Sequence, residues 1–413
     1  MKGRESAMDE QSPVIGIITV GYNRVDSISR LLNRLNDCDY PHGDVPLVIS
    51  LDNCGKTDVL DFAEAYRWRH GKKTVIHQPQ RLGLKRHILK CGSYIEAYGW
   101  DAAIVLEDDV YTAACFYEYA RQAVIAYRDD DRIAGISLYA LTQNQTVQYP
   151  FSPALSQYDA YFMQYAQSLG QVWMRRQWKV FESWYSENSE TFTECGGVPF
   201  NVCRWPETSW LKYHIRYCVE NDKYFVYPYN SLTTNFGDVG SHTTRRNSFL
   251  QTALQQKAKA AYNFPRFGCC DVNYDAWCEN TGLVFDGIDP SQVCIDIYGG
   301  KRNYQNRRYW LTSLPKPYRI VKSFGMELLP PDMNVLCNLP GDAIFLYDTA
   351  EADTPPEVPD RDVFMWGYYN RLMYPDPAIR KLADGINKEI RRERRKLLRN
   401  PKELFKKIAS RLR

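Results

Sequence analysis

The chain has 413 residues, 44% of them hydrophobic and 24% charged, which excludes fibrous and intrinsically disordered proteins and predicts a globular chain with more than one structural unit. Its net charge of +3 is unevenly distributed: residues 379–413 carry 14 Lys and Arg against 4 Asp and Glu, so this segment is +10 and the other 378 residues sum to −7. An acidic body without a nucleic-acid-binding motif argues against a protein that binds nucleic acid.

Residues 13–140 alternate apolar, strand-like runs with amphipathic helical stretches, which is the pattern of a parallel βαβ sheet. The predicted strands are 14–20, 46–51, 74–77, 102–106 and 133–138. The predicted helices are 28–35, 60–70, 84–98 and 113–127. We therefore expect an α/β fold with a mixed, mainly parallel sheet flanked by helices.

Beyond residue 150 the sequence is rich in aromatic residues and loops. The predicted elements here are helices at 172–185 and 209–219, a strand at 223–228, a loop at 230–244 and a last strand at 341–348. Acidic, proline-rich sequence then predicts a linker. The expected organisation is a domain over 13–245, with halves 13–140 and 150–245, an accessory region over 246–348, a linker over 349–378 and a tail over 379–413.

The tail places apolar residues mostly at helical spacing opposite many Lys and Arg, which predicts a basic amphipathic helix, kinked or restarted near Pro401. Such a helix is typical of binding to an anionic membrane surface. A solvated helix or a coiled-coil arm that pairs subunits is the alternative, and the oligomeric state is left open.

The cysteines and the N-terminal sequence indicate a compartment. Twelve cysteines spread from Cys38 to Cys337 without a C-x-x-C pair, which predicts neither a zinc site nor a disulfide framework. The first residues are polar, and no apolar run approaches the roughly 18 residues of a membrane-spanning helix. We expect a cytoplasmic protein, with the tail attaching it peripherally to the inner face of the plasma membrane as a hypothesis.

Three adjacent acids, Glu107, Asp108 and Asp109, directly follow the predicted buried strand 102–106. In open α/β sheets, ligands bind at the carboxyl ends of the strands. Three neighbouring carboxylates repel one another, and a divalent cation with a preference for oxygen ligands, Mn²⁺ or Mg²⁺, relieves that repulsion. The alternative is a solvated acidic turn.

Small and polar residues also follow the first two predicted strands. A glycine there lets a nucleotide approach the backbone, and an arginine can contact a phosphate. The candidate residues after the first strand are Thr19, Gly21, Tyr22, Asn23 and Arg24. Asp52 closes the second strand, where its carboxylate either accepts a hydrogen bond from a base or forms an Asx turn.

Two further segments are candidates for contacts with the same ligand. Arg81, Lys85 and Arg86 surround a predicted helix start, which favours anions and suits a diphosphate, although a solvated basic turn is equally consistent. The loop 230–244 contains hydroxyl groups and glycines that can fold over a ligand, and a histidine that can ligate a metal or contact phosphate. The candidates in this loop are Ser231, Thr233, Gly237 and His242.

The order of these motifs resembles the GT-A glycosyltransferases of the large inverting family 2. The motifs that carry the resemblance are T-V-G-Y-N-R at 19–24, Asp52, the basic helix start and V-L-E-D-D-V at 105–110. W-P-E-T-S-W-L-K at 205–212 and S-L-T-T-N-F-G-D-V-G-S-H at 231–242 are similar to segments of the N-acetylglucosaminyltransferase that begins hybrid N-glycans. Together the resemblance covers about 13–245 and implies a GT-A, Rossmann-like fold.

The resemblance implies roles for individual residues. Asp109 would coordinate the metal that bridges the donor diphosphate, while Asp108 and Glu107 would contact ribose, sugar or metal-bound water. Asp52 would contact the base, Thr19–Arg24 would cradle the nucleotide, and the S-L-T-T-N-F-G loop would order over the donor. The related enzyme has its catalytic Asp immediately before a Trp. Ser209 stands at that position here, so Glu207 is the candidate base, with a helix N-terminal carboxylate as the alternative.

The leading hypothesis is an inverting, metal-dependent hexosyl- or N-acetylhexosaminyltransferase. It would move a sugar from a UDP-sugar to a glycan or lipid-linked saccharide acceptor in surface polysaccharide biosynthesis. One alternative is an enzyme similar to a sugar-nucleotide pyrophosphorylase, although G-Y-N-R is not the glycine-rich loop of those enzymes. The other is a non-catalytic adaptor associated with a membrane through its tail.

Overall fold

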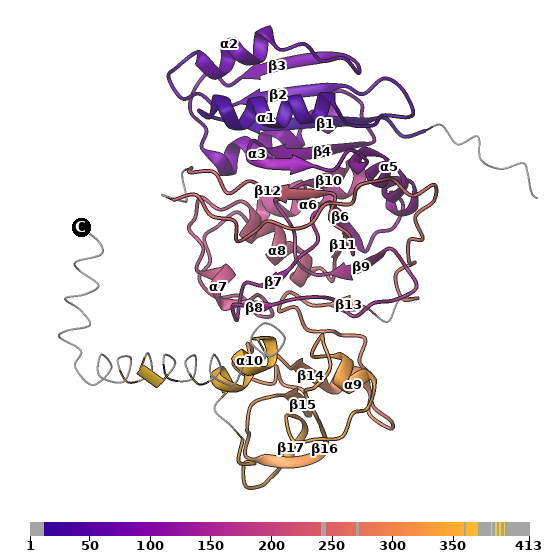
Figure 1. The fold of residues 1–413 in the computed structure, drawn as a ribbon, viewed down its shortest axis with the longest axis vertical. Helices are drawn as coiled ribbons and strands as arrows, with labels where there is room; N and C mark the ends of the chain where they lie inside the picture. Colours follow the sequence, from indigo (N-terminus) through magenta and orange to yellow (C-terminus); the bar gives the residue numbers. More distant parts are fainter. Residues whose placement is uncertain are drawn as a thin grey trace, which may run out of the picture. The chain divides into compact units, whose positions relative to one another are not determined.

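The computed structural model describes residues 12–240, 245–269, 272–358 and 361–370, together with Lys381, Gly385, Lys388, Glu389 and Arg392 (Figure 1). Most of the predicted tail 379–413 therefore lies outside the described residues. Within the described part, none of the helices combines the length and the apolar character needed to cross a membrane. The chain divides into one compact unit made of residues up to 291 with 300–306, and a second made of 292–299 with the residues from 307 onward.

The first unit is built around a mixed sheet that, within the described residues, has the strand order β13-β9-β11-β6-β10-β4-β1-β2-β3. Figure 1 shows it running from β3 to β13 with helices packed along it. Its strands are β1 (Ile15–Gly21), β2 (Leu47–Leu51), β3 (Lys73–His77), β4 (Ala102–Glu107), β6 (Ile133–Ser137), β9 (Ala160–Met163), β10 (Gln171–Met174), β11 (Tyr224–Pro228) and β13 (Asn273–Tyr274). The predicted α/β class is confirmed.

The strands β4, β1, β2 and β3 are parallel neighbours, so their carboxyl ends meet at one edge of the sheet. Every residue of β1 and β2 is buried, as expected for strands covered on both faces. The covering helices of this unit are α1 (Val25–Asn36), α2 (Asp58–Ala65), α3 (Leu84–Gly92), α4 (Tyr94–Ala97), α5 (Phe116–Tyr127), α6 (Arg175–Glu187), α7 (Phe200–Cys203) and α8 (Leu211–Glu220). Helix α1 buries Ile28, Leu31, Leu32 and Leu35 at helical spacing.

One predicted helix was wrong at its start. Residues 171–174 form strand β10, which lies antiparallel between β4 and β6, and helix α6 begins only at Arg175. All four β10 residues are buried, so this short apolar run has no polar face by which its period can be recognised. The predicted helix 84–98 is divided at Ser93 into α3 and α4. The helix predicted at 60–70 ends at Ala65 because Tyr66 is extended.

Two short strands link the acidic turn to a distant segment. Strand β5 (Val110–Thr112) pairs antiparallel with β12 (Thr233–Asn235), inside the segment that was predicted as a loop. A second two-stranded ribbon joins β7 (Gln143–Asn144) to β8 (Tyr149–Pro150). The β5–β12 pairing matters most for function because it fixes the chain after Asn235 beside the acids that follow β4.

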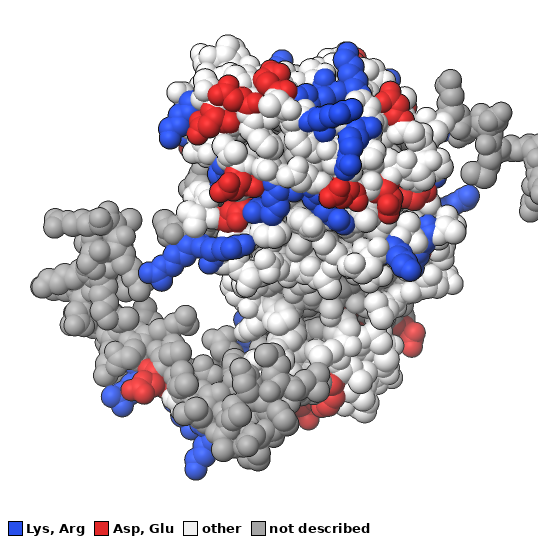
Figure 2. All heavy atoms as spheres, turned by 45° about the horizontal axis from the view of Figure 1, so that its top comes forward, with Lys and Arg blue, Asp and Glu red and all other residues white. Residues whose placement is uncertain are grey.

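The first unit extends past the boundary predicted at residue 245. Strand β13 pairs with β9, and the rings of Tyr262 and Phe264 lie 5.0 and 5.3 Å from that of Tyr119 on α5. The buried residues Tyr262, Val272, Tyr274, Trp277 and Leu283 therefore belong to the core of the first unit. On the face shown in Figure 2, basic and acidic side chains are interspersed over the N-terminal half of this unit.

The second unit contains a sheet of order β14-β15-β17-β16, formed by β14 (Val293–Asp296), β15 (Tyr309–Thr312), β17 (Ile344–Ala352) and β16 (Tyr318–Phe324). A 3₁₀ turn at Pro290–Gln292 precedes β14, and the helices are α9 (Met333–Leu336) and α10 (Arg361–Asn370). The end of strand β17 and the whole of helix α10 lie within the predicted linker 349–378. Asp348 on β17 is fully buried and accepts hydrogen bonds from Arg308 and Arg319.

Candidate functional site

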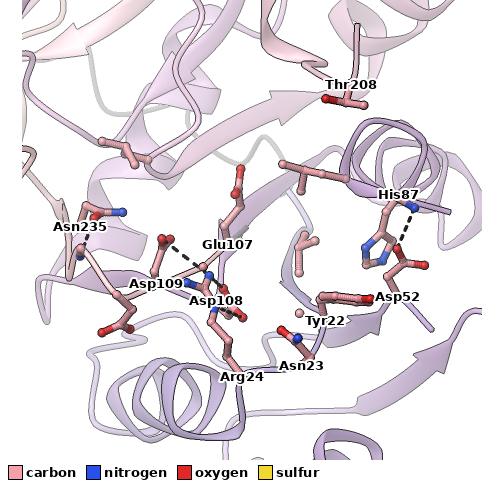
Figure 3. Close-up of a pocket in the computed structure, with 18 of the residues that line it drawn as sticks. Tyr22, Asn23, Arg24, Asp52, His87, Glu107, Asp108, Asp109, Thr208 and Asn235 are labelled. Atoms are coloured by element: carbon pink, nitrogen blue, oxygen red, sulfur yellow. Dashed lines mark hydrogen bonds and ion pairs between the residues drawn. The ribbon is translucent and has the colours of Figure 1, made fainter. Parts of the chain in front are cut away.

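A cleft of about 460 Å³ opens at the carboxyl ends of β1, β2 and β4 (Figure 3). The sequence candidates that line it are Gly21, Tyr22, Asn23, Arg24, Asp52, Arg81, Glu107, Asp108, Asp109 and Gly237. They come from segments up to 216 residues apart in the chain, between Gly21 and Gly237. The parallel order β4-β1-β2 brings the first three of these segments to one edge, and the β5–β12 ribbon brings the fourth.

The acids after β4 face one arginine from the start of α1. The Nε of Arg24 donates to Asp108 at 3.2 Å, and a terminal nitrogen of the same guanidinium contacts the other carboxylate oxygen. That nitrogen lies 3.7 Å from a carboxylate oxygen of Asp109. In Figure 3 the Glu107 side chain points away from this pair, into the open part of the cleft.

Burial dominates the electrostatics of these acids. It raises the pKa of Asp108 to about 6, even though the hydrogen bond and charge of Arg24 act in the opposite direction. Burial and then the charges of Asp109 and Asp108 raise the pKa of Glu107 to about 8. Both acids therefore hold a proton more readily than an exposed carboxyl group does, and a bound cation would favour their ionised forms.

The residues that follow β12 form a strap, defined here as residues 235–240, across one side of the cleft. The backbone N–H of Phe236 donates to the carbonyl of Asp109 at 2.8 Å, and that of Gly237 donates to the Asn235 side chain at 2.6 Å. Gly237 has φ +63°, and a Cβ at this position would lie 1.6 Å from the carbonyl oxygen of Asn247. Only glycine fits here.

Asp238 fixes the strap to helix α1. Its carboxylate accepts hydrogen bonds from the Ser27 hydroxyl at 2.8 Å and from Arg30. Burial acts to raise the pKa of Asp238, but the hydrogen bonds from Arg30 and Ser27 hold it below its ordinary value. The guanidinium of Arg30 also lies 3.8 Å from the centre of the Phe236 ring. The strap, held against α1, thus forms one wall of the cleft.

Asp52 organises the opposite side. Its carboxylate is 4% exposed and accepts backbone hydrogen bonds from Leu82 at 2.7 Å, Gly83 at 2.8 Å and Asn53 at 2.9 Å. These bonds tie the start of α3 to the end of β2. Nearby, the guanidinium of Arg81 lies 5.2 Å from the centre of the Tyr22 ring, which leaves both groups beside the cleft.

Six sequence candidates do not line the cleft. Thr19, Ser231 and Thr233 are buried in the sheet and its ribbon, and the Ser231 and Thr233 hydroxyls bond to backbone carbonyls. Lys85 lies 4.6 Å from the Tyr213 ring, while Arg86 is exposed and donates to the Leu82 carbonyl. Glu207 is exposed on a turn next to Thr208, which does line the cleft. His242 lies outside the described residues.

Among the lining residues that were not singled out from the sequence are Leu169, Thr208, Asn247 and Leu250. They come from loops, where no periodic pattern marks a side chain as facing a ligand. Thr208 alone carried a signal, because it adjoins the candidate Glu207. The others depend on how distant loops pack together.

The chemistry of the cleft fits a hard divalent cation bound together with a ligand. Within the described residues, no three His, Cys, Asp or Glu side chains converge closely enough to form a complete metal site. Asp108 and Asp109 nevertheless stand side by side in the cleft wall. Mg²⁺ and similar ions are commonly held by one or two carboxylates, with substrate phosphates and water as the other ligands.

No protein-family model matches the sequence, and no curated protein shows significant sequence similarity to it. Among solved structures, the chain is similar to S. aureus TarS residues 1–349, with 13% identity and a TM-score of 0.33 over 53% of this chain and 59% of that one. The similarity to the TarS complex with UDP-GlcNAc has 14% identity and a TM-score of 0.35 over 55% of this chain and 60% of that one. The similarity to the mannosyltransferase PcManGT from Pyrobaculum calidifontis, in complex with GDP-Man and Mn²⁺, has 15% identity and a TM-score of 0.29 over 40% of this chain and 46% of that one. The chain thus spans 60% or less of each, and similarity this low says nothing about activity.

Proposed function

We propose that the chain is a metal-dependent, inverting glycosyltransferase of GT-A type that moves a sugar from a UDP-sugar to a saccharide or lipid-linked saccharide acceptor. The observation that supports this most is the single cleft in which the acids after β4, the turn after β1 and Asp52 all meet. A nucleotide diphosphate needs a base contact, a close backbone approach and a charged group in one place. Surface polysaccharide synthesis remains the hypothesis for its pathway.

In this proposal different residues of the cleft bind different parts of the donor. Asp109 and Asp108 would hold Mn²⁺ or Mg²⁺, which would neutralise the charge that develops on the departing diphosphate. The backbone of Gly21 and the side chains of Tyr22 and Asn23 would lie along the nucleotide. Fixed charges in a partly enclosed cleft stabilise such a transition state more strongly than the same charges in water.

The hydrogen bonds already made by Asp52 favour uracil over guanine. One carboxylate oxygen accepts from both Leu82 and Asn53, so its two lone pairs are occupied, whereas the other accepts only from Gly83. A single acceptor site therefore remains, which matches the one imino N–H of uracil. Guanine presents two adjacent donors on its Watson–Crick edge and would need both oxygens of the carboxylate. This count supports a UDP-sugar donor.

A donor screen tests the proposed function. We expect purified protein to hydrolyse or transfer from at least one UDP-sugar when Mn²⁺ or Mg²⁺ is present, and to lose that activity with EDTA. GDP- and CMP-sugars should react at least about tenfold more slowly, since mispairing a buried carboxylate typically costs more than 1.4 kcal/mol. Equal rates with GDP-sugars, or full activity in EDTA, would contradict the proposal.

Glu207 is the proposed catalytic base: it is exposed on a turn and adjoins Thr208, which lines the cleft. We expect Glu207→Gln to lower the transfer rate by about a hundredfold or more. Its dissociation constant for UDP with Mn²⁺ should stay within about twofold of wild type, because a base acts on the acceptor. Calorimetric titration and a transfer assay on the same sample separate the two effects. If transfer falls less than tenfold, another carboxylate is the base, with Asp238 and Asp222 to be tested next.

A further inference from the structure

Arg24 contacts both the acids after β4 and the strap. Two of its guanidinium nitrogens bond to the two carboxylate oxygens of Asp108, and one of them lies 3.7 Å from Asp109. The third nitrogen is 3.5 Å from the carbonyl oxygen of Val239 in the strap. The Asp108 side chain is 5% exposed, so this arginine provides its main positive partner in the described structure.

This geometry creates a competition for Asp108. A guanidinium remains protonated in proteins, so it leaves a carboxylate only by moving and never by losing its charge. Both oxygens of Asp108 are engaged by Arg24. Each oxygen keeps one further acceptor site, but a divalent cation bound there together with Asp109 would lie close to the guanidinium. Repulsion between the two positive charges then favours the displacement of Arg24.

The surroundings of Arg24 allow such a displacement. Its side chain is 24% exposed and its contact with the strap is long, so the guanidinium is held mainly by the two acids, Asp108 and Asp109, that a cation would bind. A Cβ at position 240 would lie 2.9 Å from an Arg24 nitrogen, so Gly240 leaves the space that the guanidinium occupies. Arg30, one turn and a half further along α1, differs because it is held by both Asp238 and the Phe236 ring.

We propose that Arg24 is an exchangeable counter-ion, which competes with the divalent cation for Asp108 and moves to the donor diphosphate when the cation binds. This inference rests on the proposed function and adds a coupling to it. The planar guanidinium pairs with two phosphate oxygens as readily as with two carboxylate oxygens. Each ligand thereby removes an obstacle to the other, so cation and donor bind cooperatively, and the coupling is reciprocal.

The test measures Mn²⁺ and UDP binding by calorimetry at pH 8.5, where protons compete little with the cation, for wild type, Arg24→Gln and Arg24→Lys. Without UDP, Arg24→Gln is expected to bind Mn²⁺ about tenfold more tightly than wild type, because one charged hydrogen-bonding partner no longer competes. With saturating Mn²⁺, it is expected to bind UDP about tenfold more weakly, because the diphosphate loses that partner. Arg24→Lys retains the charge but not the two-pronged guanidinium, so its affinities for Mn²⁺ and UDP should lie between those of wild type and Arg24→Gln.

Arg69→Gln is the matched control, since it removes an equal charge from an exposed arginine that pairs with Asp37 and does not line the cleft. Its Mn²⁺ affinity should change less than about threefold, as expected for a charge that is further away and screened by salt. Melting curves show which variants fold. If Arg24→Gln does not fold, the Mn²⁺ and UDP affinities of Arg24→Lys test the exchange instead.

The opposite signs of the two effects make the outcomes distinct. If wild type binds both ligands but Arg24→Gln binds Mn²⁺ no more tightly, or Arg69→Gln binds Mn²⁺ more tightly to the same extent, the exchange is wrong while the proposed function stands. If Arg24→Gln weakens both ligands alike, Arg24 is a static donor contact and the exchange is again wrong. If wild type binds neither Mn²⁺ nor UDP, even together, the proposed function itself fails.

Discussion

Replacing Asp109 with Asn is expected to lower metal-dependent sugar transfer by about a hundredfold or more, while the melting temperature stays within about 3 °C of wild type. Asp109 lines the cleft beside Asp108, and its backbone carbonyl, which the substitution leaves intact, holds the strap through Phe236. The side chain itself faces two other acids, so the fold gains little from its charge. The measurements are transfer rate against added Mn²⁺ and a thermal unfolding curve on the same preparation.

The control for this variant is Asp61→Asn, which removes one charge from an exposed position on helix α2. It should leave both rate and stability near wild type, because isolated surface charges contribute little. Two results would count against the metal role of Asp109. One is transfer within tenfold of wild type at every Mn²⁺ concentration, and the other is a large fall in melting temperature that accounts for the lost activity.

The central sheet was predictable where the sequence has one repeated pattern. Each parallel strand of the N-terminal half is a short apolar run before a turn, and the observed bounds of β1, β2, β3 and β4 lie within one residue of the predicted ones. Strand β10 was missed because it is antiparallel, fully buried and continuous with helix α6. Its pairing with β4 and β6 decides its conformation, and that information lies elsewhere in the chain.

The cleft was predictable in its acids and in the residues that follow β1 and β2, because strand ends of a parallel sheet share one edge. The pairing of Arg24 with Asp108 was not predicted, because the expected role of Arg24 was a phosphate contact. Likewise, nothing local indicates that Thr233–Asn235 pairs with the strand after Asp109. Such contacts depend on tertiary packing over more than 80 residues of separation, as for the 84 between Arg24 and Asp108.

The region before helix α8 shows how a buried charge shapes another wall of the cleft. The Lys212 side chain is 1% exposed and donates to the backbone carbonyls of Phe192 at 2.9 Å, Cys203 at 3.0 Å and Trp205 at 3.1 Å. These three bonds use every donor of the ammonium group. Burial lowers the pKa of Lys212. One side chain thus ties together a segment with little regular structure, just before Glu207 and Thr208.

We expect Lys212→Met to lower the free energy of unfolding by about 3 kcal/mol or more, because three carbonyls lose a charged donor and the apolar stem cannot replace it. Urea unfolding at pH 7.5 measures this loss. Lys179→Met is the control: Lys179 is exposed on helix α6, where its pairing with Glu96 should contribute less than about 1 kcal/mol. In the folded fraction, KM for the acceptor should rise more than the dissociation constant for UDP, because the loosened segment carries Thr208 and the proposed base Glu207. Equal stability of the two variants would show that water replaces the ammonium group at no cost, and an unchanged acceptor KM would show that the Lys212 bonds do not position this wall.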